Sequence, residues 1–112
     1  MPGKRGDLIA GTLDLLVLKL LDLGPMHGYG IAEMLERGTE HVLAVNQGSL
    51  YPALYRLKRR GWIRSDWRVT ENNRRARYWS ITDKGLVQLA AEREQWERLS
   101  QAVNVILQLR TT

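Results

Sequence analysis

The residues best suited to chemistry in this sequence are arginines and lysines that concentrate in one stretch. Residues 56–77 hold nine basic and two acidic side chains, a net charge of +7. The whole chain of 112 residues carries a net charge of only +5, so the remainder is mildly acidic. A concentrated cationic patch on such a body attracts polyanions, with nucleic acid as the first expectation and an anionic membrane surface as the second.

Other kinds of chemistry lack the residues that they need. The chain has no cysteine, which excludes a disulfide scaffold, a thiolate zinc site, an iron–sulfur cluster and a cysteine nucleophile. It has two histidines, too few for an all-histidine metal site, and no serine with a plausible histidine–acid arrangement. Gly28 and Gly30 are expected to permit close backbone approach, because no βαβ context makes them a nucleotide-binding loop. We therefore expect no enzyme activity, no metal and no cofactor, and a structural role for His27 at a helix start.

The apolar run at residues 8–23 resembles a signal peptide or a membrane span at first sight. Charged residues interrupt it at Asp14, Lys19 and Asp22. No stretch of about twenty uncharged apolar residues occurs in the sequence. We therefore expect a cytoplasmic protein without a membrane span. Binding to a membrane surface is a weaker alternative, because the basic residues do not share one amphipathic face.

Helices and a hairpin must position the basic stretch, and the spacing of apolar residues predicts where they lie. Apolar residues at helical intervals indicate helices at about residues 12–23, 28–38, 49–60 and 82–109. Partial alternation indicates two strands, at residues 62–69 and 77–81, joined by a polar turn at residues 70–76. We expect residues 1–6 to be irregular and residues 41–45 to form one brief strand.

Three helices followed by a hairpin are typical of a winged helix-turn-helix. The predicted fold is mainly α with a small β-hairpin. A winged helix-turn-helix domain would cover residues 1–81, and a long C-terminal helix at residues 82–112 would complete one compact unit.

Two details of packing follow from this arrangement. The residues expected to face inward include Ile31, Met34 and Leu35 of the second helix and the hairpin tryptophans Trp62, Trp67 and Trp79. Pro52 predicts that the third helix is capped by Gly48 or Ser49, because a proline is harmless only in the first turn of a helix.

The third helix has one apolar face to hold it to the domain and one polar face to bind a ligand. A helix fits the major groove of DNA, and arginines at a hairpin tip suit the adjacent backbone or minor groove. The predicted DNA-binding residues are Tyr29, Gln47, Ser49, Tyr51, Tyr55, Lys58, Arg59, Arg74, Arg75 and Arg77. For the three tyrosines, packing is the alternative interpretation. A module that binds an acidic protein, or one that binds RNA, remains open.

The last helix carries an apolar seam in its second half, which a domain of this size cannot cover. Such a seam needs a partner helix, and this predicts a homodimer. The predicted interface residues are Leu18, Leu99, Val103 and Ile106. One recognition helix from each subunit would then enter successive major grooves, so the operator is expected to be a near-palindrome.

Several motifs resemble those of PadR-type transcriptional regulators. They lie at residues 12–18, 24–31, 48–57, 61–63, 73–79 and 81–85. His-Gly-Tyr-Gly at residues 27–30 and Leu-Tyr-Pro-Ala-Leu at residues 50–54 are specific in combination. The resemblance covers about residues 9–99 and points to the small subfamily with a single C-terminal dimerisation helix. It implies a dimeric winged-helix protein that binds double-stranded DNA, usually as a repressor.

Some members of that family release DNA when phenolic acids or flat hydrophobic drugs bind. The resemblance and the apolar seam together imply an effector site for a planar aromatic or phenolic molecule, which would stack on Trp96 and its dimer mate. The predicted effector-binding residues are Leu13, Asp14, Leu16, Val17 and Trp96. The alternative is that Trp96 only packs in the dimer.

Overall fold

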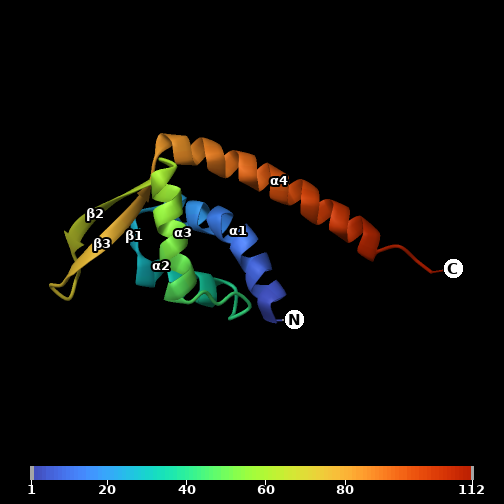
Figure 1. The fold of residues 1–112 in the computed structure, drawn as a ribbon, viewed down its shortest axis with the longest axis horizontal. Helices are drawn as coiled ribbons and strands as arrows, with labels where there is room; N and C mark the ends of the chain where they lie inside the picture. The colour runs from blue at the N-terminus through green and yellow to red at the C-terminus, as the bar shows by residue number, and fades with distance from the viewer. Residues whose placement is uncertain (1, 112) are drawn as a thin grey trace.

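The chain folds into a mainly helical body with a small antiparallel sheet, as the sequence predicts. The computed structural model describes the backbone of residues 2–111 and the side chains of residues 12–111. Its elements, shown in Figure 1, are α1 (Pro2–Leu23), β1 (Met26–His27), α2 (Gly28–Gly38), α3 (Gln47–Arg59), β2 (Ile63–Val69), β3 (Arg75–Ile81) and α4 (Asp83–Leu107).

The sheet has the strand order β1-β3-β2, and both pairings are antiparallel. β2 and β3 form the hairpin, with a register that runs from Ile63 opposite Ile81 to Val69 opposite Arg75. β1 pairs only with the base of this hairpin, where Met26 lies opposite Trp79 and His27 opposite Tyr78. The outer part of the hairpin therefore has no third strand beside it.

One core joins α1, α2, α3, the hairpin base and the start of α4. Burying a leucine side chain contributes about 2 kcal/mol, so this core is the main source of stability. Trp79 is fully buried, and it is the largest side chain in the core. The other core residues are Leu13, Val17, Leu18, Leu21, Ile31, Leu35, Leu50, Ala53, Leu54, Leu57, Ile63 and Leu89.

The first helix is longer than predicted. α1 begins at Pro2, whereas we expected residues 1–6 to be irregular and the helix to start at Thr12. Pro2 fits the first helical position, because the N–H group that proline lacks has no partner there. Of the residues expected to be irregular, Met1 lies outside the described part of the chain.

The segment between α2 and α3 is irregular, and the brief strand predicted at residues 41–45 is wrong. Glu40 and His41 adopt φ values of 51° and 69°, in the left-handed region, which turns the chain away from an extended path. The Thr39 hydroxyl donates to the Leu35 carbonyl at 2.7 Å and accepts from the Leu43 N–H at 3.0 Å. Local bonds therefore replace the strand partner.

The cap of α3 also differs from the prediction. Asn46 is the N-cap, and its Oδ1 atom accepts from the Ser49 N–H at 2.9 Å, so Pro52 lies beyond the first turn. The helix nevertheless continues to Arg59. Pro52 removes one backbone bond, to the carbonyl of Gly48, and both residues are exposed, so water can take the place of the missing donor. At its other end, Gly61 (φ 78°) closes α3 in the left-handed conformation that glycine adopts without strain.

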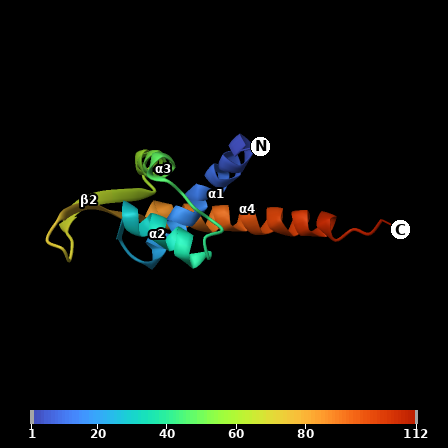
Figure 2. The same ribbon diagram turned by 90° about the horizontal axis from the view of Figure 1, so that it is seen from below.

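The long helix α4 is anchored at its start and projects beyond the body at its end (Figures 1 and 2). Thr82 caps it, with its Oγ1 atom accepting from the Gly85 N–H at 3.0 Å. A Cβ atom on Gly85 would lie 2.0 Å from the Trp62 carbonyl oxygen, so glycine allows this close approach to the hairpin base. The molecule measures 63 × 29 × 22 Å, because α4 reaches far past its contacts with α1.

Candidate nucleic-acid interface

The outward face of α3 is polar and exposed, as predicted. Gln47, Ser49, Lys58 and Arg59 all face solvent. The opposite face is buried in the core through leucines and Ala53, so the helix is held rigidly while this face remains free. A helix held in this way can present its side chains to the edges of bases.

Tyr51 and Tyr55 lie on the flank of α3 that faces the hairpin and the start of α2. Tyr51 is half-buried, and a Cβ atom on Gly28 would lie 2.5 Å from its hydroxyl oxygen. Tyr55 is 41% exposed and meets the Trp79 ring edge-on at 5.6 Å between ring centres. Both tyrosines therefore pack against the body and still border the outer surface.

His27 caps α2, which confirms its predicted structural role. Its Nδ1 atom accepts from the Gly30 N–H at 2.9 Å. A Cβ atom on Gly30 would lie 3.3 Å from the imidazole Cε1 atom, which explains why a glycine suits that position. Tyr29 is 62% exposed, and its ring lies nearly parallel to the imidazole, with 6.3 Å between ring centres.

The hairpin turn is shorter than predicted, so the two tip arginines have different settings. The Thr70 N–H donates to the Arg74 carbonyl at 2.7 Å, and Asn73 adopts a φ of 60°. Arg75 lies in β3 opposite Val69, where we expected it in the turn. Both arginine side chains are exposed, so both remain available to a polyanion.

Trp67 corrects the prediction that the hairpin tryptophans form the core. Trp79 is buried and Trp62 is half-buried, but Trp67 is 58% exposed. Its strand extends past the body, and its ring lies beneath the guanidinium groups of Arg75 and Arg77, at 5.3 and 5.9 Å. The sequence contained a signal that Trp67 is exposed, because alternate residues of a strand share a face and the face of Trp67 also carries the polar Ser65. Met34, which we expected to face inward, is likewise 44% exposed.

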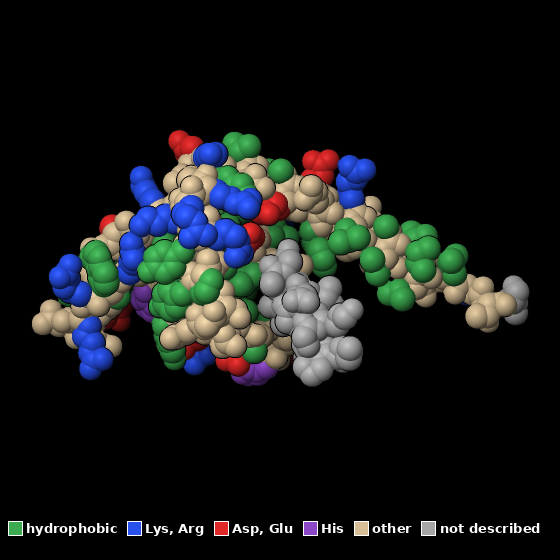
Figure 3. Space-filling view, viewed as in Figure 1, with side chains coloured by type: hydrophobic (Ala, Val, Ile, Leu, Met, Phe, Trp, Pro, Cys, Tyr) green, Lys and Arg blue, Asp and Glu red, His purple; other side chains and the backbone are tan. Residues whose placement is uncertain are grey.

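A groove of about 640 Å³ lies between α3, the start of α2 and the hairpin. Its walls combine aromatic rings with three arginines, a composition that suits a nucleic-acid strand, since arginine pairs with phosphate and rings pack on sugars or bases. Figure 3 shows Lys and Arg side chains gathered on one face, over α3 and the sheet. The groove is lined by His27, Gly28, Tyr29, Tyr51, Tyr55, Trp67, Thr70, Arg74, Arg75, Ala76 and Arg77.

The groove brings together six of the ten predicted DNA-binding residues. These are Tyr29, Tyr51, Tyr55, Arg74, Arg75 and Arg77. The other four, Gln47, Ser49, Lys58 and Arg59, lie on the exposed face of α3. The prediction missed Trp67 and Thr70, which line the groove from β2 and the turn.

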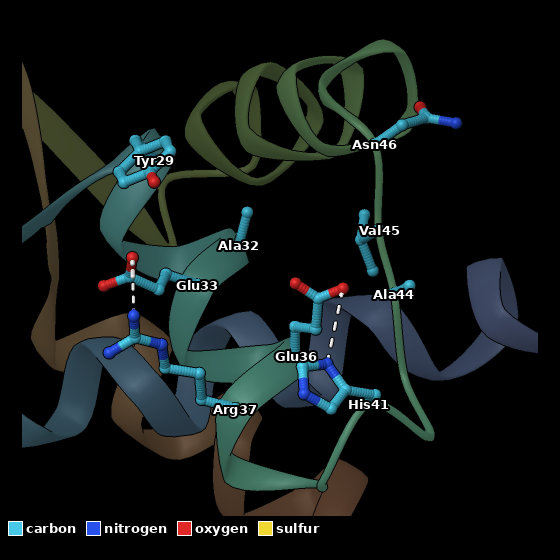
Figure 4. Close-up of a pocket in the computed structure, with 9 residues that line it drawn as sticks. All are labelled: Tyr29, Ala32, Glu33, Glu36, Arg37, His41, Ala44, Val45 and Asn46. Atoms are coloured by element: carbon cyan, nitrogen blue, oxygen red, sulfur yellow. Dashed lines mark ion pairs between the residues drawn. The ribbon is translucent and has the colours of Figure 1, made fainter.

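A second hollow, of about 610 Å³, lies between α2 and the segment that leads to α3. Figure 4 shows its two carboxylates turned toward basic side chains: a Glu33 carboxylate oxygen lies 3.8 Å from an Arg37 nitrogen, and a Glu36 carboxylate oxygen lies 3.7 Å from the His41 Nδ1 atom. The carboxylates disfavour phosphate, so this hollow marks the edge of the cationic surface.

Charged side chains of α1, α3 and α4 also lie close together. The Arg56 guanidinium donates to the Asp14 carboxylate at 2.5 Å. Burial raises the pKa of the nearby Glu92 carboxyl, and the charge of Asp14 raises it further, while a hydrogen bond from Gln88 and the charge of Arg60 lower it.

The predicted effector and dimer residues divide into buried and exposed groups. Leu13 and Val17 lie in the core, so they cannot line an open cleft of the subunit, whereas Asp14 and Leu16 are half-buried. Leu18 is also fully buried within the subunit, so it does not lie on the surface where a second subunit would bind. The residues on α4 are exposed: Trp96 by 45%, Leu99 by 57%, Val103 by 46% and Ile106 by 65%.

The described residues also bear on metal sites and on membrane spans. Among the described residues, no three His, Asp or Glu side chains are grouped as metal ligands would be. Within the same part of the chain, no helix has the length and hydrophobicity needed to span a membrane.

Known proteins share both the sequence pattern and the fold. A family model described as the transcriptional regulator PadR-like family matches residues 17–91. A solved transcriptional regulator from Clostridium thermocellum is 31% identical, with a TM-score of 0.80, and the match covers 88% of this chain and 95% of that one. A PadR-like transcriptional regulator from Bacillus cereus is 28% identical, with a TM-score of 0.82 and coverage of 93% and 99%.

A PadR family transcriptional regulator from Eggerthella lenta is similar over even more of this chain. It is 29% identical, with a TM-score of 0.79, and the match covers 97% of this chain and 93% of that one. The matched family consists of DNA-binding transcriptional regulators and not of enzymes, which agrees with the expectation from the sequence. The chain belongs to the PadR-like family of transcriptional regulators.

Proposed function

We propose that the protein is a cytoplasmic homodimeric repressor that binds a near-palindromic operator. In this proposal α3 enters the major groove, and the hairpin reaches the adjacent backbone or minor groove. The observation that carries it is the cationic and aromatic groove between α3 and the hairpin, which combines both elements into one surface. Gln47, Ser49, Lys58 and Arg59 would face the bases and phosphates, with Arg74 and Arg75 on the neighbouring backbone.

The homodimer would form through α4. Large apolar side chains on the projecting part of this helix are exposed in the subunit, and they include Trp96, Leu99, Val103 and Ile106. A second copy of the chain offers the same seam, so two α4 helices can bury each other's apolar surface. Repression then needs no further chemistry, because an occupied operator excludes the transcription machinery.

A planar aromatic or phenolic effector would bind where the two subunits meet. Trp96 supplies an exposed ring for stacking, and the half-buried Leu16 and Asp14 on α1 are the accessible members of the predicted site. The dimer would have two states that differ in the spacing of the two α3 helices. The ligand can shift the balance between these states only by the difference between its affinities for them. Titration with a planar drug tests this step: Trp96→Leu should abolish both the fluorescence quenching and the binding, and retention of both would discard the site.

The central test is selection of bound sequences from random DNA duplexes at physiological salt. The expected product is a symmetric motif whose half-sites lie about 34 Å, or one helical turn, apart. Single-stranded RNA and an acidic protein serve as competitors in the same assay. Absence of an enriched motif, or displacement of the duplex by RNA, would overturn the proposal.

A further inference from the structure

Arg77 differs from the other hairpin arginines because its side chain is held between two elements. Its Nε atom donates to the Ser65 hydroxyl of β2 at 3.0 Å, and one terminal nitrogen donates to the Tyr55 hydroxyl of α3 at 3.1 Å. The side chain is half-buried, whereas Arg74 and Arg75 are exposed.

Three aromatic rings complete the setting of this guanidinium. Its central carbon lies 5.2 Å from the ring centre of Trp79, 5.5 Å from that of Tyr55 and 5.9 Å from that of Trp67. These distances are within the range of cation–π attraction. The rings belong to β3, α3 and β2, so one charged group contacts α3 and both strands of the hairpin.

Arg77 lies at the point along the hairpin where pairing with β1 ends. β1 supports β3 only at Tyr78 and Trp79, and Arg77 is the next residue toward the tip. From Arg77 outward, the two-stranded hairpin projects from the body, and an isolated two-stranded hairpin is at best marginally stable by itself. The bond from Arg77 to Tyr55 therefore lies where the supported base of the hairpin gives way to its projecting part.

We infer that Arg77 is a positioning residue that sets the angle between the recognition helix α3 and the hairpin, and that it acts through Tyr55. This inference rests on the proposed function, because the angle matters only if both elements engage one duplex. With the angle held, binding of α3 places Arg74 and Arg75 at the backbone. With the angle free, the second contact loses the advantage of a pre-organised geometry.

The chemistry of the side chain supports this role. A guanidinium is planar and can donate in two directions at once, toward Ser65 and toward Tyr55, while its faces lie against rings. A lysine ammonium would keep the charge but not this fixed fork. Tyr55→Phe removes only the accepting hydroxyl and retains the ring, so it is the mildest disruption of the contact.

The first experiment measures the angle without DNA. The chain has no cysteine, so Lys58→Cys and Asn72→Cys place one spin label on α3 and one at the hairpin tip. Labelled protein is diluted with unlabelled protein, and the distance within one subunit is measured by pulsed electron resonance. The expected result is one narrow distribution of label-to-label distances in the parent. Both Tyr55→Phe and Arg77→Gln should lose this single narrow distribution.

Arg68→Gln is the matched control for this measurement. Arg68 belongs to the same hairpin, but it bonds to Asp66 at 3.0 Å and lies over Tyr78, 5.3 Å from the ring centre. Its contacts stay within the hairpin, so its replacement should leave the narrow distance unchanged. An unchanged distance in Arg77→Gln as well would overturn the inference.

The second experiment measures affinity of the unlabelled protein for the selected operator. Arg77→Gln and Tyr55→Phe should each weaken operator binding about tenfold, as expected for loss of a hydrogen bond to a charged group. The double variant should be no weaker than Arg77→Gln alone, because both changes break one contact. Additive losses would mean that Arg77 and Tyr55 contact DNA separately, and would overturn the inference. If neither the parent protein nor any variant binds DNA, but the label distances change as expected, the proposed function is wrong. The role of Arg77 in holding the angle between α3 and the hairpin would still be supported.

Discussion

The Asp14 carboxylate on α1 accepts a hydrogen bond from the Arg56 guanidinium on α3 at 2.5 Å, and this contact connects the first helix to the third. The two side chains are only 20% and 38% exposed. Asp14→Asn should therefore lower the free energy of unfolding by about 1–2 kcal/mol, because a partly buried charge loses its partner. Urea unfolding measures the change. Asp22→Asn, in the more exposed pair with Lys19, is the control and should shift stability by less than about 0.5 kcal/mol.

Glu92 gives the protein a defined dependence on pH. Burial and Asp14 raise the pKa of its carboxyl in the folded state above the ordinary value of 4.5, so between the two pKa values the folded protein binds more protons than the unfolded chain. Ionised Glu92 therefore destabilises the fold, and its contribution becomes less favourable as the pH rises through that window. Glu92→Gln should raise the denaturation midpoint at pH 7 and have no such effect at pH 4. An equal shift at both pH values would contradict this assignment.

The hairpin arginines should contribute charge to every DNA complex, whatever its sequence. If each subunit neutralises about four phosphates, the logarithm of affinity should fall with the logarithm of salt at a slope near −7 for the dimer. Replacing both Arg74 and Arg75 by alanine should weaken operator and random duplexes alike and reduce the slope to about −3.6, because four of the eight contacts of the dimer are lost. Mobility-shift titration measures both quantities.

The control for that experiment removes the same charge from another place. Arg93 and Arg98 lie exposed on α4, away from the groove. Their replacement by alanine should leave the slope near −7. If both double variants change the slope equally, net charge decides the affinity and the groove does not.

The contact between Gly28 and Tyr51 should tolerate no added side chain. A Cβ atom on Gly28 would lie 2.5 Å from the tyrosine hydroxyl oxygen and 2.8 Å from Cζ. Gly28→Ala should therefore destabilise the protein by about 1–3 kcal/mol and move Tyr51. Tyr51→Phe should recover part of this loss in the double variant. Gly38→Ala, at a position with open space around it, should be neutral in the same thermal-unfolding assay.

The exposed seam of α4 should decide the oligomeric state. Leu99→Glu and Val103→Glu would each place a charge in the proposed interface, where burying it without a partner is unfavourable. Sedimentation should show dimers for the parent and monomers for both variants, with loss of operator binding. Val87→Glu, on an exposed part of α4 near its anchored start, is the matched control and should remain dimeric. A parent that sediments as a monomer would contradict the proposed assembly.

Local signals were sufficient to predict most of the fold. Thr82 and Gly61 mark helix ends because their bonds and dihedral angles involve only neighbouring residues. His27 was assigned to a helix start for the same reason. The two-residue strand β1 had no such signal, because it exists only by pairing with β3, which lies about fifty residues further along the chain.

The candidate interface was predictable in composition but not in arrangement. Residue types alone identified the cationic stretch and ten candidate contacts. Trp67 was expected to face inward with the other hairpin tryptophans, yet its strand extends past the body and its side chain is exposed. Leu18 was placed at the dimer interface because α1 is apolar on most of its surface, yet the subunit itself covers it.

The sequence by itself determined where the helices and the hairpin form and where the positive charge concentrates, since periodicity, caps and charge depend on neighbouring residues. Only the tertiary structure decided which of these residues share a surface. Arg74, Arg75 and Arg77 are nearly adjacent in the chain, but the sheet register and the approach of α3 leave two exposed and enclose the third between Tyr55 and Trp79. The burial of a side chain depends on elements distant in sequence, and their approach is specified by the packing of the whole core.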